Sequence, residues 1–68
     1  MKVELWVEIK GKIDSKALYD IIGHQGMNVT ELDDKTLVYG ECYILTASQV
    51  IYHCSLFGET VSTIKHRG

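Results

Sequence analysis

Apolar and polar residues alternate along residues 3–10, VELWVEIK. The apolar positions are Val3, Leu5, Val7 and Ile9. A period of two predicts a β-strand with one buried face. The chain's only tryptophan, Trp6, falls on the opposite face, between Glu4 and Glu8. An aromatic side chain among carboxylates on the outer face of a strand needs an explanation from the rest of the fold.

A helix is predicted after this strand. Gly11 interrupts the alternation, and Asp14 is a residue type that caps helix N-termini. The apolar positions that follow are Ala17, Leu18, Ile21 and Ile22, which fall on one helical stripe. Gly23 or Gly26 can end the helix in a left-handed conformation.

A second helix is predicted in the other half of the chain. We expect Thr46 or Ser48 to cap its N-terminus and Gly58 to close it. Its apolar stripe is Val50, Ile51, Cys54 and Phe57.

Three further strands complete the predicted elements. Residues 27–32 (MNVTEL) and 36–43 (TLVYGECY) are separated by Asp33, Asp34 and Lys35, a short polar connection suited to a hairpin. Residues 60–66 (TVSTIKH) are rich in β-branched side chains, which favour strands. The element order is therefore β-α-β-β-α-β.

Strand polarity predicts the arrangement of the sheet. The first and third strands are strongly apolar and belong in the centre, whereas residues 27–32 and 60–66 are half polar and belong at the edges. Right-handed crossovers then place both helices on one face. We expect an α+β fold, the ferredoxin-like βαββαβ arrangement, with an antiparallel four-stranded sheet in the order 4-1-3-2.

In element order the whole chain resembles the small ferredoxin-like modules, a group that includes ACT, heavy-metal-associated and acylphosphatase domains. The segment after the first strand, KGKIDSK at residues 10–16, distinguishes it from two of these. It lacks the C-x-x-C of a heavy-metal-associated domain and the arginine of an acylphosphatase. The resemblance implies the fold, and function must come from the site itself.

Length and composition narrow the classes of protein. The 68 residues are expected to form a single domain (1–68), and one core of that size supplies roughly 3–5 kcal/mol, so such chains often rely on a disulfide, a metal or a partner subunit. A net charge of −2 offers no overall attraction to nucleic acid or anionic lipid. No segment has the pattern of a signal peptide or a membrane span, so we expect a cytoplasmic protein. We expect it to bind neither nucleic acid nor a membrane.

Candidate catalytic and metal-binding residues are few. Cys42 and Cys54 are spaced too widely for a metal or redox motif and are expected to be buried thiols. With His24, His53 and His66 they are spread over four predicted elements, without the i, i+3 or i, i+4 spacing of metal ligands. No pair of carboxylates is placed for acid and base chemistry. We therefore expect no metal, no cofactor and no enzymatic activity. A transition-metal site that uses Cys42 or Cys54 with a histidine is the remaining alternative.

The segment KGKIDSK suggests a second hypothesis. Lys10, Gly11, Lys12 and Lys16 surround a glycine loop that leads into a helix N-terminus, an arrangement that can bind an anion. This would suit a regulatory domain of the ACT type that binds a small ligand. Three lysines on a solvated loop are the alternative explanation.

The face of the sheet away from the helices is the leading candidate for function. If the third strand buries Val38 and Cys42, its other face presents Leu37 and Tyr39 beside Trp6. The opposite phase, which buries Leu37 and Tyr39, stays open because Leu37-Val38-Tyr39 is continuously apolar.

Two explanations of Trp6 follow from the first phase. An exposed aromatic patch is the usual mark of a protein interface. Glu4, Glu8 and Glu41 on the same face would repel the phosphates of RNA. We expect a partner interface formed by Trp6, Glu4, Glu8, Leu37 and Tyr39, with a second copy of the chain or with another protein. The alternative is that Trp6 lies flat on the open sheet under lysine stems.

Overall fold

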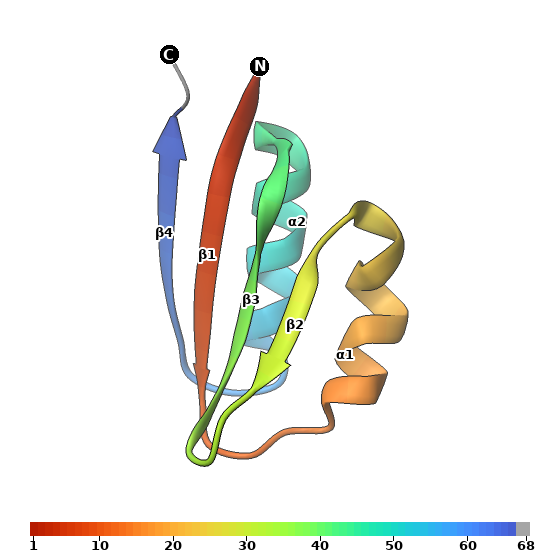
Figure 1. The fold of residues 1–68 in the computed structure, drawn as a ribbon, viewed down its shortest axis with the longest axis vertical. Coiled ribbons are helices and arrows are strands. Elements are labelled where there is room, and N and C mark those ends of the chain that lie inside the picture. The colour runs from red at the N-terminus through yellow and green to blue at the C-terminus, as the bar shows by residue number, and fades with distance from the viewer. Residues whose placement is uncertain (67–68) are drawn as a thin grey trace.

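The computed structural model describes residues 1–66 as seven consecutive elements (Figure 1). They are β1 (Lys2–Lys10), α1 (Ser15–Ile22), the 3-10 turn η1 (Gly23–Gln25), β2 (Asn28–Glu31), β3 (Lys35–Tyr43), α2 (Ile44–Ser55) and β4 (Thr60–His66). The predicted order of strands and helices is confirmed.

The four strands form one antiparallel sheet in the order β2-β3-β1-β4. Read from the other edge this is 4-1-3-2, so the predicted central and edge strands are confirmed. Helix α2 packs against β1, β3 and β4, whereas α1 packs against α2 and β2, so both helices cover the same face (Figure 1). The molecule has two layers, and the other face of the sheet is open.

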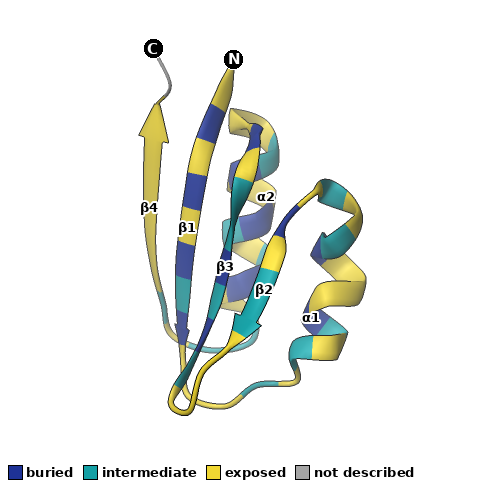
Figure 2. Cartoon of the chain, in the orientation of Figure 1, coloured by how far each residue is buried: buried dark blue, intermediate teal, exposed yellow. Residues whose placement is uncertain are grey.

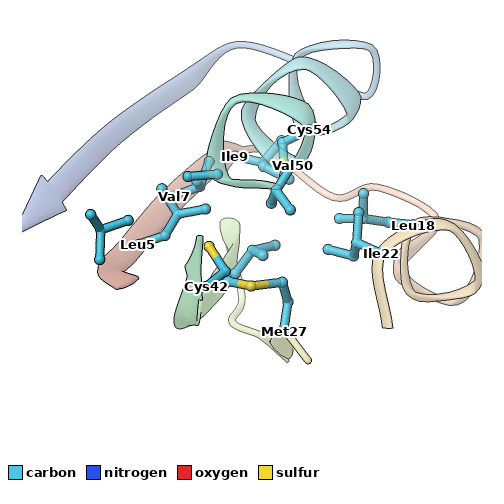
Figure 3. Close-up of a cluster of buried hydrophobic side chains, with 12 residues drawn as sticks. Leu5, Val7, Ile9, Leu18, Ile22, Met27, Cys42, Val50 and Cys54 are labelled. Carbon is cyan, nitrogen blue, oxygen red and sulfur yellow. The ribbon is translucent and has the colours of Figure 1, made fainter. Parts of the chain in front are cut away.

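The core lies between the sheet and the helices. Strand β1 alternates between buried and exposed residues along its length (Figure 2), as its sequence predicts. In Figure 3 Leu5, Val7 and Ile9 lie on one side of Val50 and Cys54 of α2. Leu18 and Ile22 of α1 lie on the other side. The buried hydrophobic residues are Val3, Leu5, Val7, Ile9, Leu18, Ile22, Met27, Val38, Cys42, Ala47, Val50 and Cys54.

The first helix begins and ends as predicted. The side-chain carboxylate of Asp14 accepts a hydrogen bond from the backbone N–H of Ala17 at 3.1 Å, which satisfies one of the free amides of the first turn. At the other end, Gly26 has φ of 82° and forms the left-handed cap after η1. Gly23 stays in the right-handed helical region. Of the two glycines proposed to end the helix, Gly26 is the one in a left-handed conformation.

The predicted start of the second helix is wrong. Helix α2 begins at Ile44, immediately after β3, and its N-cap is Tyr43, whose side chain makes no capping hydrogen bond. Ser48 lies inside the helix, where its hydroxyl donates to the carbonyl of Ile44 at 3.4 Å. The chain thus passes from strand to helix without a loop, and neither Thr46 nor Ser48 is the cap.

Of the two predicted orientations of β3, the structure has the one that buries Val38 and Cys42 and places Tyr39 on the open face of the sheet. Thr36, Val38 and Cys42 point toward the helices and are buried, whereas Leu37 and Tyr39 are half-buried on the open face. Gly40 belongs to the helix side, where an added Cβ would lie 3.1 Å from the carbonyl oxygen of Gly26. A side chain at position 40 would therefore crowd the Gly26 carbonyl, and glycine avoids that close contact.

Candidate interaction surface

Trp6 and Tyr39 form an aromatic stack at the middle of the open face. They are register partners on β1 and β3, their ring centroids lie 5.5 Å apart and their planes are inclined by 29°. Trp6 retains 43% of its surface exposure. The hydroxyl of Tyr39 lies 3.3 Å from that of Thr30 on β2, within hydrogen-bonding distance. Tyr39 thus contacts Trp6 of β1 on one side and Thr30 of β2 on the other, and part of Trp6 stays open to solvent.

Glu8 and Leu37 lie beside the stack. They are register partners, and the Glu8 carboxylate accepts a hydrogen bond from the Lys35 ammonium at 3.0 Å. This hydrogen bond and the charge of Glu8 raise the pKa of Lys35. The carboxylate next to Trp6 is thus already compensated by a lysine of the same sheet.

Like charges are paired across strands at each side of this aromatic centre. Glu4 lies directly opposite Glu41, and Lys10 lies directly opposite Lys35. Like charges directly opposite each other on neighbouring strands are unfavourable. We call the Glu4–Glu41 pair the acidic row, the Trp6–Tyr39 pair the aromatic row and the Lys10–Lys35 pair the basic row. Lys65 of β4 lies opposite Glu4 at the other edge of β1, and the Glu8–Leu37 pair lies between the aromatic and basic rows.

A hollow of about 410 Å³ lies over the acidic and aromatic rows. It is lined by Glu4, Leu5, Trp6, Tyr39, Gly40, Glu41, Thr63 and Lys65. All the residues predicted for the interface therefore come together on one face, with Glu4, Trp6 and Tyr39 in the hollow and Glu8 and Leu37 in the adjacent row.

The residues predicted for anion binding are less well placed for it. The backbone N–H of Gly11 donates to the carbonyl of Asp34 at 2.8 Å, and the ammonium of Lys10 lies 3.8 Å from the Glu59 carboxylate. Lys12 and Lys16 are exposed. The amide of Ala17 that an anion would use is bonded to Asp14. The structure thus assigns protein partners to the loop amide and to one amide of the helix start.

The hollow nearest this loop, about 250 Å³, is partly acidic. Lys12 lines it together with Glu31 and Asp33, and its remaining walls are Ile13, Leu32 and Thr36. Two carboxylates beside one lysine favour a cation over an anion.

The cysteines are buried, as predicted. Burial raises the pKa of the Cys54 thiol to about 11 and also raises that of Cys42, so both stay protonated at neutral pH. Over residues 1–66, no group of three or more His, Cys, Asp and Glu side chains has the arrangement of a metal site. Within the same residues, no helix is long and apolar enough to cross a membrane.

Sequence reasoning missed a second apolar surface, on the outer side of α2. Leu45, Tyr52 and Leu56 are 78%, 60% and 64% exposed. The signal was available in the sequence, because residues 44–55 contain no Asp, Glu, Lys or Arg. A helix without charge on any face is unusual at a protein surface.

Comparison of the chain with models of known protein families, with curated proteins and with solved structures found no match. Arguments about function therefore rest on the two surfaces themselves.

Proposed function

We propose that the chain is a small, cytoplasmic, non-enzymatic interaction module that self-associates by packing the open faces of two sheets against each other. The element order and the strand order support a ferredoxin-like fold for it. Its open face is the surface that such a two-layer fold leaves uncovered.

The observation that carries this proposal is the exposure of Trp6. A large aromatic side chain at the centre of a face, stacked on Tyr39 and 43% exposed, still has apolar surface to bury. Aromatic residues are enriched at the cores of protein interfaces and dominate their binding energy. A chain with a core this small also gains stability from a partner subunit.

Charge complementarity selects a second copy as the partner. A two-fold axis that runs across the strands above Val7 and Val38 brings position 4 of one copy opposite position 10 of the other, and position 41 opposite position 35. The acidic row of each sheet then meets the basic row of its partner. Opposite charges of the two copies then face each other at both ends, and the aromatic row lies between them, near the centre.

Charge reversal tests this arrangement. In one variant Lys10→Glu and Lys35→Glu make both rows acidic, and in a second variant Glu4→Lys and Glu41→Lys make both rows basic. Each variant alone should lose the contact, because like rows meet. An equimolar mixture should regain it, because an acidic copy then faces a basic copy at both ends. Trp6 is the only tryptophan, so a shift of its fluorescence to shorter wavelength reports burial of this face alone.

Each variant measured alone is the control for the mixture. Any effect of the substitutions on Trp6 within a single chain is already present in the separate samples, so only a new contact between the two variants can change the emission on mixing. Circular dichroism establishes that both are folded. A mixture whose tryptophan emission equals the average of the two separate samples would exclude this pairing of the rows.

A further inference from the structure

The hollow of about 410 Å³ on the open face is bordered by two pairs of side chains of different chemistry. Trp6 and Tyr39 are register partners across β1 and β3, and the next pair on the same face is Glu4 with Glu41. Alternate residues of a strand point to the same face and lie about 7 Å apart. A group that enters the hollow therefore meets aromatic surface on one side and two carboxylates on the other.

The floor of the hollow between these two rows is backbone. Leu5 and Gly40 are register partners that lie between the rows, and both line the hollow. The side chain of Leu5 is buried on the helix side, and Gly40 has no side chain. No side chain of β1 or β3 therefore rises between the aromatic row and the acidic row. The volume falls within the range of small-ligand sites, roughly 300–1,000 Å³.

The charge of the hollow favours a cation. Its walls contain the carboxylates of Glu4 and Glu41 and the ammonium of Lys65. Lys65 lies opposite Glu4 on β4, whereas Glu41 lies beyond Glu4 on β3, so Lys65 compensates Glu4 more closely than Glu41. A carboxylate accepts several hydrogen bonds, so each glutamate can accept from a ligand in addition to a partner in the chain. A ligand with one positive charge makes the hollow neutral.

We infer that this hollow binds a guanidinium group. A guanidinium is planar and less strongly hydrated than an ammonium, stacks on aromatic rings and donates two parallel hydrogen bonds to a carboxylate. Trp6, which is 43% exposed beside Tyr39, supplies the aromatic surface, and Glu41 supplies the acceptor. An ammonium would match the charge but not the planar stacking surface. A small guanidine compound and an arginine side chain of another protein share this chemistry.

Such a ligand has a consequence for self-association, one that rests on the proposed function. In the two-fold arrangement proposed above, the partner's Lys10 and the partner's Lys35 face the acidic row. A guanidinium in the hollow competes with these ammonium groups for the same carboxylates and covers Trp6. The bound ligand is therefore expected to favour separate copies.

Tryptophan fluorescence of protein at nanomolar concentration, where copies are separate, tests the site. The probes are ethylguanidinium and ethylammonium, which carry the same charge and the same alkyl group, at constant ionic strength. Ethylguanidinium should change the emission of Trp6 saturably, with an affinity at least about fivefold higher than that of ethylammonium. An arginine flanked by two glycines, with both termini blocked, carries the same single charge. Tighter binding of this peptide than of ethylguanidinium identifies a protein as the source of the guanidinium, and weaker binding identifies a small compound.

Two matched variants locate the site. Glu41→Gln removes an acceptor and a charge from the hollow and should weaken ethylguanidinium binding at least about tenfold. Glu41 is exposed, so the fold should be retained, which circular dichroism checks. Glu59→Gln removes the same charge from an exposed position just before β4, outside the hollow, and should change the affinity by less than about twofold.

Three results would overturn the inference. They are emission without a saturable change, equal affinity for the two ethyl probes, and equal weakening by Glu41→Gln and Glu59→Gln. The proposed function is read separately by sedimentation at high micromolar concentration, where ethylguanidinium should lower the mean mass. Saturable binding to a protein that is monomeric with and without the probe would leave the guanidinium site standing and would refute the proposed function.

Discussion

Replacing Leu18 with alanine is expected to lower the free energy of unfolding by about 2–5 kcal/mol, because the change leaves a cavity in a packed core. Leu18 is fully buried and is one of two α1 residues that close the core. One core in a chain of this size supplies roughly 3–5 kcal/mol, so this change removes a large share of the free energy of unfolding. Urea denaturation followed by circular dichroism, in dilute protein, measures the difference.

Leu45→Ala is the matched control, since it makes the same change in a helix at a side chain that is 78% exposed. In dilute protein, where copies are separate, its effect should stay within about 0.5 kcal/mol. A loss for Leu18→Ala no larger than that of the control would contradict the placement of α1 over the core.

Trp6→Ala should abolish the sheet contact while the monomer keeps its fold. Truncation of a central interface aromatic costs about 2 kcal/mol or more, which is roughly a thirtyfold increase in the dissociation constant. The monomer loses the stack on Tyr39, worth about 0.5–1.5 kcal/mol, and the part of the Trp6 surface that is already buried within the chain. Sedimentation should therefore change from dimer to monomer.

Trp6→Phe keeps an aromatic ring on Tyr39 and should retain most of the association. If Trp6→Ala sediments as the unmodified protein does, Trp6 is a surface residue outside any contact between copies. A collapsed circular dichroism spectrum would instead mean that Trp6 contributes to the intramolecular core.

The layers of the fold could be predicted because the sequence signals for them are local. The period of two in β1 identifies its buried face, and Asp14 identifies the start of α1. The half-polar segments 27–32 and 60–66 identify the sheet edges, because strands with so many polar side chains are unsuited to the centre of the sheet. Strand β4 is almost entirely exposed, as expected of an edge (Figure 2).

The remaining features depend on contacts between distant residues. Leu37-Val38-Tyr39 is apolar throughout, so its phase is decided by the pairing of Tyr39 with Trp6 and of Val38 with Val7. The sequence pattern places Met27 in a strand. In the structure it precedes β2 and packs over Gly40, where an added Cβ would lie 3.1 Å from the terminal carbon of Met27. Neither contact has a signature in the local pattern.

The candidate surfaces were predicted unevenly for a physical reason. Trp6 was conspicuous because a single aromatic residue interrupts a polar face. Leu45 and Tyr52 were not, because a mostly apolar helix hides its outer stripe among core residues. Capping preferences also misplaced the helix start, since Thr46 and Ser48 are good caps in isolation, whereas β3 runs straight into α2 at Tyr43.

Dilution of the unmodified protein, followed by tryptophan fluorescence, tests the central claim most directly. Trp6 is the sole tryptophan, so its emission reports the open face and nothing else. If two open faces pack together, emission should shift to longer wavelength as the protein is diluted from high micromolar to nanomolar concentration, with a midpoint that moves when Lys10 and Lys35 are reversed in charge. Emission that stays constant over the whole range, at the position of a half-exposed indole, would contradict self-association through this face.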